Sequence, residues 1–287
     1  MNSFMYLHEN ASRTGSECHI YELQVMGGSE PIISHWHDEV EVIYCECSGS
    51  IYIEEDVFFF KKGDILFVNK QKLHSCIVNE AGVLTCFLFN YEILVSKQND
   101  WCDENLISPM IRGILHFPVF IKKGHPLYNR TREVLQNIFS ANKNTEQRKY
   151  VRIKALLYDL IYTFCENDAF VLNYNKGEPQ NRIIYVKAII SYMKKNIASP
   201  ILLEDLCVHV NLSKSYMIKI FKSITGQTPA VYLRNLRLKQ AFEYLKSGKS
   251  VTQTALCCGI DNISYFIREY KKVYGVTPKK TAVIKDS

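Results

Sequence analysis

The sequence between Leu202 and Pro278 contains the same structural unit twice, and this repeat constrains the fold more than any other feature. An internal repeat indicates a fold built from equivalent supersecondary units. The matching segments are SYMIKIFK at 215–222 with GQTP at 226–229, and SYFIREYK at 264–271 with GVTP at 275–278.

Each copy predicts a short helix, a tight corner and a second, capped helix. The corner carries Asn211 in the first copy and Gly259 in the second, and both residue types tolerate left-handed backbone angles. Ser213 and Asp261 follow as candidates for the N-cap of the second helix. This order of elements is typical of a helix-turn-helix unit.

A longer helix is predicted between the two copies. Thr228 and Pro229 are suited to its N-cap and first position, and Gly248 marks its end. At 1.5 Å per residue the helix would be about 27 Å long, so two recognition helices could enter successive major grooves, which lie roughly 34 Å apart. The apolar stripe of this connector consists of Tyr232, Leu233, Leu236, Ala241 and Leu245.

These elements, in this order, resemble the double helix-turn-helix domain of AraC/XylS-type transcription regulators over about the last hundred residues. The sequence departs from the family pattern at a few positions, which mostly keep apolar volume. Ile260 stands where Phe is usual, Tyr270 replaces the Phe of the second copy, and Thr281-Ala282 occupies the place of an aromatic-Arg pair. The resemblance implies activation through contact with RNA polymerase.

The net charge of +6 is unevenly distributed along the chain. From Asn181 onward there are 18 Lys and Arg against 6 Asp and Glu, a net charge of +12, whereas the preceding residues have 17 against 23, a net charge of −6. A basic surface attracts DNA phosphates whatever the base sequence. Because the positive charge falls on the repeated unit, double-stranded DNA is the expected partner.

The exposed faces of the two predicted recognition helices supply the candidate DNA-binding residues. Lys219 and Arg268 are the strongest candidates for base contact, because they occupy equivalent positions and their side chains bond guanine O6 and N7. Lys222 and Lys271 are better placed for phosphate. The full set is Lys214, Ser215, Ile218, Lys219, Lys222, Asn262, Ile263, Ser264, Ile267, Arg268 and Lys271. For Ile218 and Ile267, contact with thymine methyl groups and burial against the connector helix both remain open.

The first ninety residues predict a small β-barrel or jelly roll, because short apolar or alternating runs are separated by turn residues at regular spacing. The runs are Cys18 to Val25, Glu39 to Tyr44, Ser50 to Ile53, Val57 to Phe60, Ile65 to Val68 and Val83 to Asn90. With the helical C-terminal region, this predicts an α+β protein of two domains, a cupin-like barrel with a helical pair and an all-α double helix-turn-helix.

Within this region, HWHDEVE at 35–41, Gly49, GDI at 63–65 and His74 resemble the two half-motifs of a cupin barrel. In cupin enzymes the matching positions hold a metal, and alternation along a strand would place His35 and His37 on one face. Three imidazoles and a carboxylate suit iron, manganese, nickel or zinc. The corresponding positions are His35, His37, Glu41 and His74.

The second half-motif departs from the enzyme pattern at Asn69 and Leu73, and the resembled regulators usually keep the barrel without a metal. We therefore expect no metal or other cofactor, and a pocket for a small-molecule effector instead. Trp36, Tyr44 and Tyr52 could stack on a sugar ring; packing within the barrel is an equally open role for each. The expected effector residues are His35, Trp36, His37, Glu41, Tyr44 and His74.

Residues 126–166 change to helical periodicity and predict two antiparallel helices. In the resembled family such helices often form a dimer interface, so a homodimer is expected; packing against the barrel is the alternative. Residues 168–181 are polar and rich in turn residues, which predicts a linker. The expected boundaries are therefore residues 1–167 for the effector domain and 182–287 for the DNA-binding domain, whose first helix is expected from Arg182 to Asn196.

The cellular setting predicted by the sequence is the cytoplasm. No apolar run is long enough to span a bilayer, and Met1 to Asn10 lacks the basic start and apolar block of an export signal. Ten cysteines occur without a Cys-x-x-Cys pair, which indicates free, mostly buried thiols. A redox sensor built on Cys45 and Cys47 is the alternative.

The sequence thus predicts a regulator, not an enzyme, because it contains no nucleophile with a base partner, phosphate-binding glycine loop or kinase motif. The main hypothesis is a DNA-binding activator that responds to a small molecule, with a sugar as the family-level candidate. Two alternatives stay open: a constitutive regulator with a ligand-free barrel scaffold, and a metal-dependent cupin enzyme with a DNA-binding tail.

Overall fold

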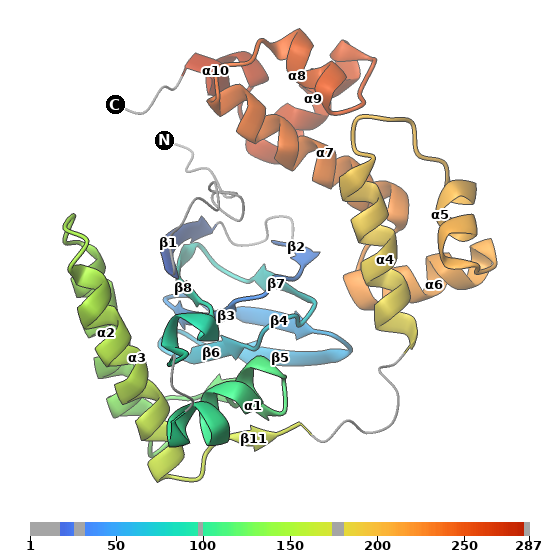
Figure 1. Ribbon diagram of the computed structural model, residues 1–287. Helices are drawn as coiled ribbons and strands as arrows, with labels where there is room; N and C mark the ends of the chain where they lie inside the picture. The colour runs from blue at the N-terminus through green and yellow to red at the C-terminus, as the bar shows by residue number, and fades with distance from the viewer. Residues whose placement is uncertain (1–17, 26–31, 97–99, 174–180, 284–287) are drawn as a thin grey trace.

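The computed structural model describes residues 18–25, 32–96, 100–173 and 181–283. It joins a strand-rich N-terminal part to a helical C-terminal part, which confirms the predicted two-part α+β architecture (Figure 1). Two sequence predictions concern residues outside the described part of the chain. One is the lack of an export signal at Met1 to Asn10, and the other is most of the second half of the expected linker.

Two antiparallel sheets form the N-terminal part. One has the strand order β1-β8-β3-β6-β10 and the other β2-β7-β4-β5, while β9 and β11 pair separately. The strands are β1 (Cys18–Val25), β2 (Ile32–His35), β3 (Val40–Cys45), β4 (Gly49–Ile53), β5 (Asp56–Phe60), β6 (Ile65–Val68), β7 (His74–Val78), β8 (Gly82–Phe89), β9 (Leu115–His116), β10 (Phe120–Ile121) and β11 (Val171–Leu172).

All six predicted strands are present to within one residue at each end, and β2, β7 and the two-residue strands were not predicted. The first half of the expected linker contains a strand. This strand, β11, pairs with β9, and the amide of Asn173 donates to the carbonyl of Ile114 (2.8 Å). Between β8 and β9 lie a 3₁₀ turn η1 (Tyr91–Leu94), a π-helical turn η2 (Asp103–Ile107) and α1 (Ser108–Ile111).

Strand alternation divides the apolar residues of the barrel between two cores. Ile43 and Cys45 of β3 face the core between the two sheets, together with residues of β4 and β7. Val40 and Val42 of the same strand face the other way, into a core that the helices complete. Because both faces of β3 are covered, nearly all of its side chains are buried.

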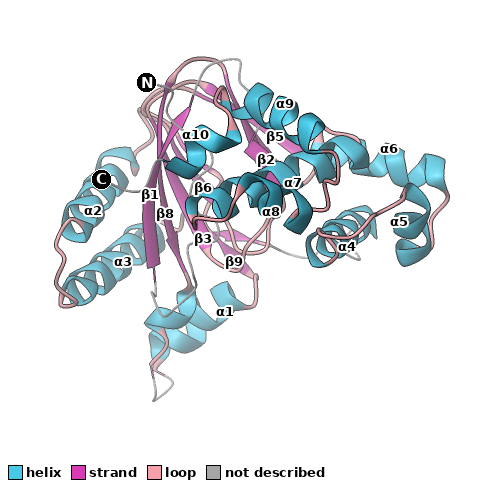
Figure 2. Cartoon of the chain, turned by 90° about the horizontal axis from the view of Figure 1, so that it is seen from above, coloured by secondary structure: helices cyan, strands magenta, loops and turns pink. Residues whose placement is uncertain are grey.

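Helices α2 (Tyr128–Asn142) and α3 (Lys149–Glu166) form the predicted antiparallel pair and cover the outer face of the five-stranded sheet (Figure 2). Aromatic rings fix this contact: Phe67 of β6 stacks on Phe117 (4.8 Å between centroids), and Phe164 of α3 meets both edge-on. Edge-to-face and stacked rings at these separations stabilise packing beyond the area they bury.

The C-terminal part is helical throughout its described length. Its helices are α4 (Asn181–Lys195), α5 (Leu203–Val210), α6 (Lys214–Thr225), α7 (Pro229–Lys246), α8 (Val251–Cys257), α9 (Ile263–Tyr274) and α10 (Pro278–Val283). One core lies among α4, α5, α6 and the start of α7, and a second among the end of α7, α8, α9 and α10. The predicted connector is confirmed as α7, which supplies Tyr232 and Leu236 to the first core and Ala241 and Leu245 to the second.

The departures at Tyr270 and Thr281 are linked in the structure. The buried hydroxyl of Tyr270 donates to Thr281 Oγ1 (3.0 Å), so the extra oxygen has a partner in the second core. A buried hydroxyl without a partner would destabilise that core.

All ten cysteines are free thiols, and most are buried, as predicted. Burial, reinforced by neighbouring Glu80 and Glu46, raises the pKa of Cys47 to about 11, and burial also raises the pKa of Cys45. Thiols that stay protonated react slowly, which argues against the redox-sensor alternative.

Among the described residues, no helix is long and apolar enough to cross a bilayer.

Replacing Phe164 with Ala should lower the free energy of unfolding of the N-terminal part by about 3 to 5 kcal/mol, because a buried ring is lost from a fixed aromatic cluster. Denaturant unfolding monitored by circular dichroism measures the change. Phe59→Ala is the matched control, since this ring is 74% exposed and its loss should change stability by less than about 0.5 kcal/mol. Equal effects of both substitutions would contradict the described packing.

Candidate functional site

Each helix-turn-helix unit turns at the predicted corner. Asn211 after α5 and Gly259 after α8 both have left-handed backbone angles (φ 52° and 67°). At Gly259 space is also limiting, because a Cβ would lie 2.8 Å from the carbonyl oxygen of Ile197. The corners place α6 and α9 as equivalent recognition helices joined through α7.

The start of α9 differs from the prediction by one residue. Asn262, not Asp261, is the N-cap, because Asn262 has an extended backbone and its Oδ1 accepts from the amide of Tyr265 (2.9 Å). Ser213 is the N-cap of α6 as predicted, although its side chain makes no capping hydrogen bond. The carboxamide oxygen of Asn262 therefore holds the helix end, and a DNA contact by this residue stays a prediction.

Nine of the eleven predicted DNA-binding side chains are exposed. The exceptions are Ile218 and Ile263, which are half-buried against the first and second cores. Burial of Ile218 agrees with the packing role left open above, whereas Ile267 remains 37% exposed. The candidates form two sets, one on α6 and one on α9, joined by α7.

The charged candidates differ in the contacts that they already make within the chain. Lys214 Nζ lies 2.8 Å from Glu204 Oε1, and this hydrogen bond raises the pKa of Lys214. Contact with phosphate would require Lys214 to exchange that carboxylate. Arg268 lies over the ring of Tyr265 (5.4 Å to the centroid), and its Nε lies 3.5 Å from Glu269 Oε1; its side chain is still 71% exposed, so a base edge can reach the guanidinium. The equivalent tyrosines Tyr216 and Tyr265 are exposed on the recognition helices and were not among the predicted contacts.

Four of the predicted effector residues gather inside the barrel, where β2, β3 and β7 meet. His35 ends β2 opposite His74 at the start of β7, and Glu41 lies on β3. One potential ligand atom from each of His35, His37, Glu41 and His74 lies within 4.8 Å of the other three. The predicted alternation along one strand is wrong, because β2 ends at His35 and His37 lies in the following loop. The cluster forms because that loop turns His37 back toward Glu41.

The three imidazoles are oriented by the backbone. Each Nδ1 lies at hydrogen-bond distance from a carbonyl oxygen, which can only accept, so Nδ1 carries the proton. A neutral imidazole fixed in this way presents Nε2 as its acceptor. The contacts are His35 Nδ1 to Ile33 O (2.7 Å), His37 Nδ1 to Glu39 O (3.0 Å) and His74 Nδ1 to Lys72 O (2.8 Å).

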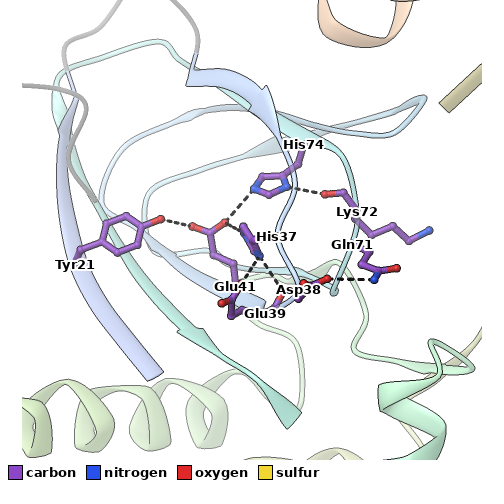
Figure 3. A network of polar contacts seen from close by, with 8 residues as sticks. All are labelled: Tyr21, His37, Asp38, Glu39, Glu41, Gln71, Lys72 and His74. Atoms are coloured by element: carbon purple, nitrogen blue, oxygen red, sulfur yellow. Dashed lines mark hydrogen bonds and ion pairs between the residues drawn. The ribbon is translucent and has the colours of Figure 1, made fainter. Parts of the chain in front are cut away.

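Glu41 lies at the centre of this network (Figure 3). Its Oε2 is 3.1 Å from His74 Nε2 and 3.5 Å from His37 Nε2, and its Oε1 accepts from the hydroxyl of Tyr21 (3.0 Å). Burial by itself would raise the pKa of Glu41, but hydrogen bonds and charge attraction from His37 and His74 outweigh it and hold the pKa well below its ordinary value. Glu41 is therefore held as a carboxylate beside the Nε2 atoms of His37 and His74.

The donor set fits a divalent transition metal. Imidazole nitrogens and a carboxylate are ligands for zinc, iron, manganese, cobalt and nickel, and hydrogen bonds from each Nδ1 to the protein are the usual means of orienting such ligands. A metal held here would add a fixed positive charge at the barrel interior.

The other predicted effector residues lie elsewhere. Tyr44 packs under the α2–α3 pair, on the face of β3 opposite Glu41. Tyr52 lies between Ile51 and Ile53, which face the inter-sheet core, so its ring faces away from that core. None of the aromatic residues proposed to stack on a sugar is brought to the histidine cluster.

Trp36 instead contacts the DNA-binding part. Its ring lies beneath Lys187 and Lys194 of α4, at 5.6 and 5.1 Å from ring centroid to Nζ. Nearby, Ser34 Oγ donates to the carbonyl of Thr225 (3.3 Å), and the hydroxyl of Tyr232 donates to the carbonyl of Ser34. Sequence reasoning missed this contact, because no single-sequence signal connects positions nearly two hundred residues apart.

Residues 206–282 match a family model described as a helix-turn-helix domain. The chain is similar to the uncharacterised HTH-type transcriptional regulator YdeC of Bacillus subtilis (strain 168), with 24% identity over 85% of this chain and 84% of that protein. Five further curated regulators match over only 89 to 124 residues, so the chain covers no more than 46% of their length.

The chain is also similar to solved structures. A probable AraC family transcriptional regulator from Rhodopseudomonas palustris CGA009 is 29% identical over 34% of this chain and 94% of that chain, with a TM-score of 0.33. ToxT from Vibrio cholerae strain SCE256, in a structure with bound unsaturated fatty acid, is 14% identical over 94% of this chain and 95% of that chain, with a TM-score of 0.47.

Replacing Arg268 with Ala should weaken binding to a specific DNA site by about 1 to 3 kcal/mol and relax its sequence preference, because a base contact is lost. Fluorescence anisotropy with the specific site and with random DNA at one salt concentration measures both effects. Lys222→Ala serves as the comparison, since a lost phosphate contact weakens both DNAs alike. If Arg268→Ala also weakens both equally, Arg268 contacts phosphate.

Proposed function

We propose that this chain is a sequence-specific DNA-binding transcription regulator of the AraC/XylS type, and that its N-terminal barrel senses an effector that controls DNA binding. The proposal places the protein in the cytoplasm, without enzymatic activity. Contact with RNA polymerase, and hence activation, is part of the same proposal.

The observation that carries the DNA-binding function is the pair of exposed, basic recognition helices joined by one buried helix. The 18 residues of α7 span about 27 Å, which suits two successive major grooves on one face of the duplex. The net charge of +12 from Asn181 onward supplies attraction to phosphate.

We assign effector sensing to the buried cluster of His35, His37, Glu41 and His74, because these side chains converge inside the barrel. A constitutive regulator with an inert scaffold would have no need for a buried carboxylate among three oriented imidazoles, since such groups destabilise a core that apolar residues could fill. The three aromatic residues expected to stack on a sugar, Trp36, Tyr44 and Tyr52, lie away from the cluster, so the geometry adds no support for a sugar.

We propose that α3 forms the homodimer interface. Its outer face carries an exposed apolar stripe at helical spacing, with Val151 73%, Tyr158 41% and Tyr162 59% exposed and Ala155 between them. Such a stripe at i, i+4, i+7 and i+11 suits helix–helix packing across a two-fold axis.

The DNA-binding function is tested by selecting sequences from a random duplex pool with the purified chain. We expect a conserved pair of half-sites one helical turn apart, and an affinity for them that falls with salt with a slope of about −0.9 per phosphate contacted. Recovery of no enriched sequence, with binding equal to that of random DNA, would exclude sequence-specific regulation.

Replacing Val151 with Asp should weaken dimerisation by at least about tenfold, since it places a charge in the apolar stripe. Sedimentation velocity over a range of concentrations measures the dissociation constant. Gln136→Asp on the exposed face of α2 adds the same charge outside the stripe and should leave the dissociation constant unchanged. A dimer unaffected by Val151→Asp would place the interface elsewhere.

A further inference from the structure

Two of the four residues in the histidine cluster are flanked in sequence by the residues that hold the barrel against the first helix-turn-helix unit. His35 lies between Ser34 and Trp36, and both of these contact that unit. His74 follows Leu73, which is buried in the same core as Val186 and Met193 of α4. The cluster and the interdomain contact therefore share short stretches of backbone at the start of β7 and the end of β2.

We propose that the effector is a divalent transition metal ion bound by His35, His37, Glu41 and His74, and that β2 and the start of β7 transmit its binding to the DNA-binding domain. This inference rests on the proposed regulatory function. It deepens that function by naming the chemical class of the effector and the route by which it acts.

The potential ligand atoms of the cluster converge. With Nδ1 of His37 and His74 donating to backbone carbonyls, their Nε2 atoms face Glu41 Oε2 at 3.5 and 3.1 Å. A proton can bridge only one such nitrogen–oxygen pair at a time, whereas one cation placed among these atoms would bond all of them at once. His35 is held in the same way and brings a third imidazole within 4.8 Å of the others.

The donor atoms of the cluster suit a divalent transition metal ion. Three nitrogens and one oxygen disfavour Mg²⁺ and Ca²⁺, which take oxygen ligands, and the described cluster contains no thiolate for a soft ion such as Cu⁺. Zn²⁺, Fe²⁺, Co²⁺, Ni²⁺ and Mn²⁺ accept this set. Burial of the side chains, with His37, Glu41 and His74 at most 8% exposed, excludes competing water.

Binding of a metal ion must move at least one of the ligands. Neighbouring donors in a tetrahedral site with bonds of about 2.0 to 2.1 Å lie roughly 3.4 Å apart, whereas the atoms here are separated by up to 4.8 Å. Glu41 Oε2 already lies at this spacing from His37 and His74 Nε2 (3.5 and 3.1 Å), so it is the longest separation in the cluster that must close by about an ångström as an ion binds. Glu41 and its strand are packed on both faces, so the end of β2 and the adjoining loop, which carry His35 and His37, are the segments with freedom to shift.

A shift of β2 acts directly on the first helix-turn-helix unit. Ser34 donates to the carbonyl of Thr225, the last residue of recognition helix α6, and accepts from Tyr232 of α7. On the other side of His35, Trp36 lies beneath Lys187 and Lys194 of α4, and Lys187 also donates to the carbonyl of Gln71. A shift of β2 would therefore change the contacts of Ser34 and Trp36, which join the barrel to α6, α7 and α4.

Metal binding is tested on chelator-treated full-length protein by isothermal titration with Co²⁺ and Zn²⁺, together with the visible absorption of bound Co²⁺. We expect about one ion per chain and no binding of Mg²⁺. His37→Ala and the isosteric Glu41→Gln should each weaken Co²⁺ binding at least about tenfold. His125→Ala, which removes an exposed imidazole before α2, is the matched control and should bind Co²⁺ normally. Circular dichroism checks that each variant is folded.

Transmission is tested by measuring affinity for the selected DNA site with and without Zn²⁺. A coupled site should change this affinity by about fivefold or more. The double variant Tyr232→Phe, Lys187→Met removes hydrogen bonds to the barrel from the DNA-binding side only. It should bind Zn²⁺ like the parent chain and lose the dependence of DNA affinity on Zn²⁺.

These measurements distinguish a failure of the metal site from a failure of the regulatory function. Failure of the parent chain to bind any of these ions would overturn the metal site, and metal binding without an effect on DNA affinity would overturn its transmission. If no DNA sequence is preferred in either state, the regulatory function itself fails, while the titration still reports on the metal site. Retained metal response in the double variant would overturn transmission through Tyr232 and Lys187.

Discussion

The burial of α7 on two sides is the constraint on which the DNA-binding half depends. Its first half supplies Tyr232 and Leu236 to the core under α6, and its second half supplies Ala241 and Leu245 to the core under α9. A helix cannot bend between two packed cores without opening one of them, and close-packed interiors resist such movement. The separation of the two recognition helices is therefore set by the length of α7, so any regulation must move the domain as a unit or release one of its cores.

Tyr232 connects this frame to the barrel. Its ring packs edge-on against Phe221 of α6 (5.3 Å between centroids), and its hydroxyl donates to the backbone of β2. One residue thus belongs to the first DNA-binding core and to the interdomain contact at the same time. With Ile33 and Leu73 buried in that core, the barrel completes the first helix-turn-helix unit and has no comparable described contact with the second. An asymmetric attachment of this kind lets one half of the DNA-binding surface respond to the barrel while the other keeps its own packing.

The sequence predicted the parts whose signals are local, and it failed where contacts are long-range. Repeats, caps and periodicity placed α6, α7, α9 and six strands, because each depends on residues near one another in the chain. Strand alternation already separates Glu41 from Tyr44, so the assignment of Tyr44 to the effector site could have been rejected from spacing alone. By contrast, the short strand β2 ends inside the motif, and its partners Thr225 and Tyr232 carry no sequence signal of that pairing. Trp36 was assigned to a pocket for the same reason, although its ring serves the interdomain contact.

The shared backbone of the histidine cluster and the interdomain contact has a thermodynamic consequence. If an ion at His35 and His74 favours one position of β2, and that position changes the hold on α6, then DNA must change the affinity for the ion by the same factor. The coupling needs no long chain of intermediates, since one peptide unit separates His35 from Ser34 and one hydrogen bond separates Ser34 from α6. The coupling free energy is limited by the contacts that differ between the two positions of β2. These contacts are two hydrogen bonds of Ser34 and the contact of Trp36 with α4. A few such contacts are enough for a response of about five- to 150-fold, which suits a regulator that must remain able to reverse its state.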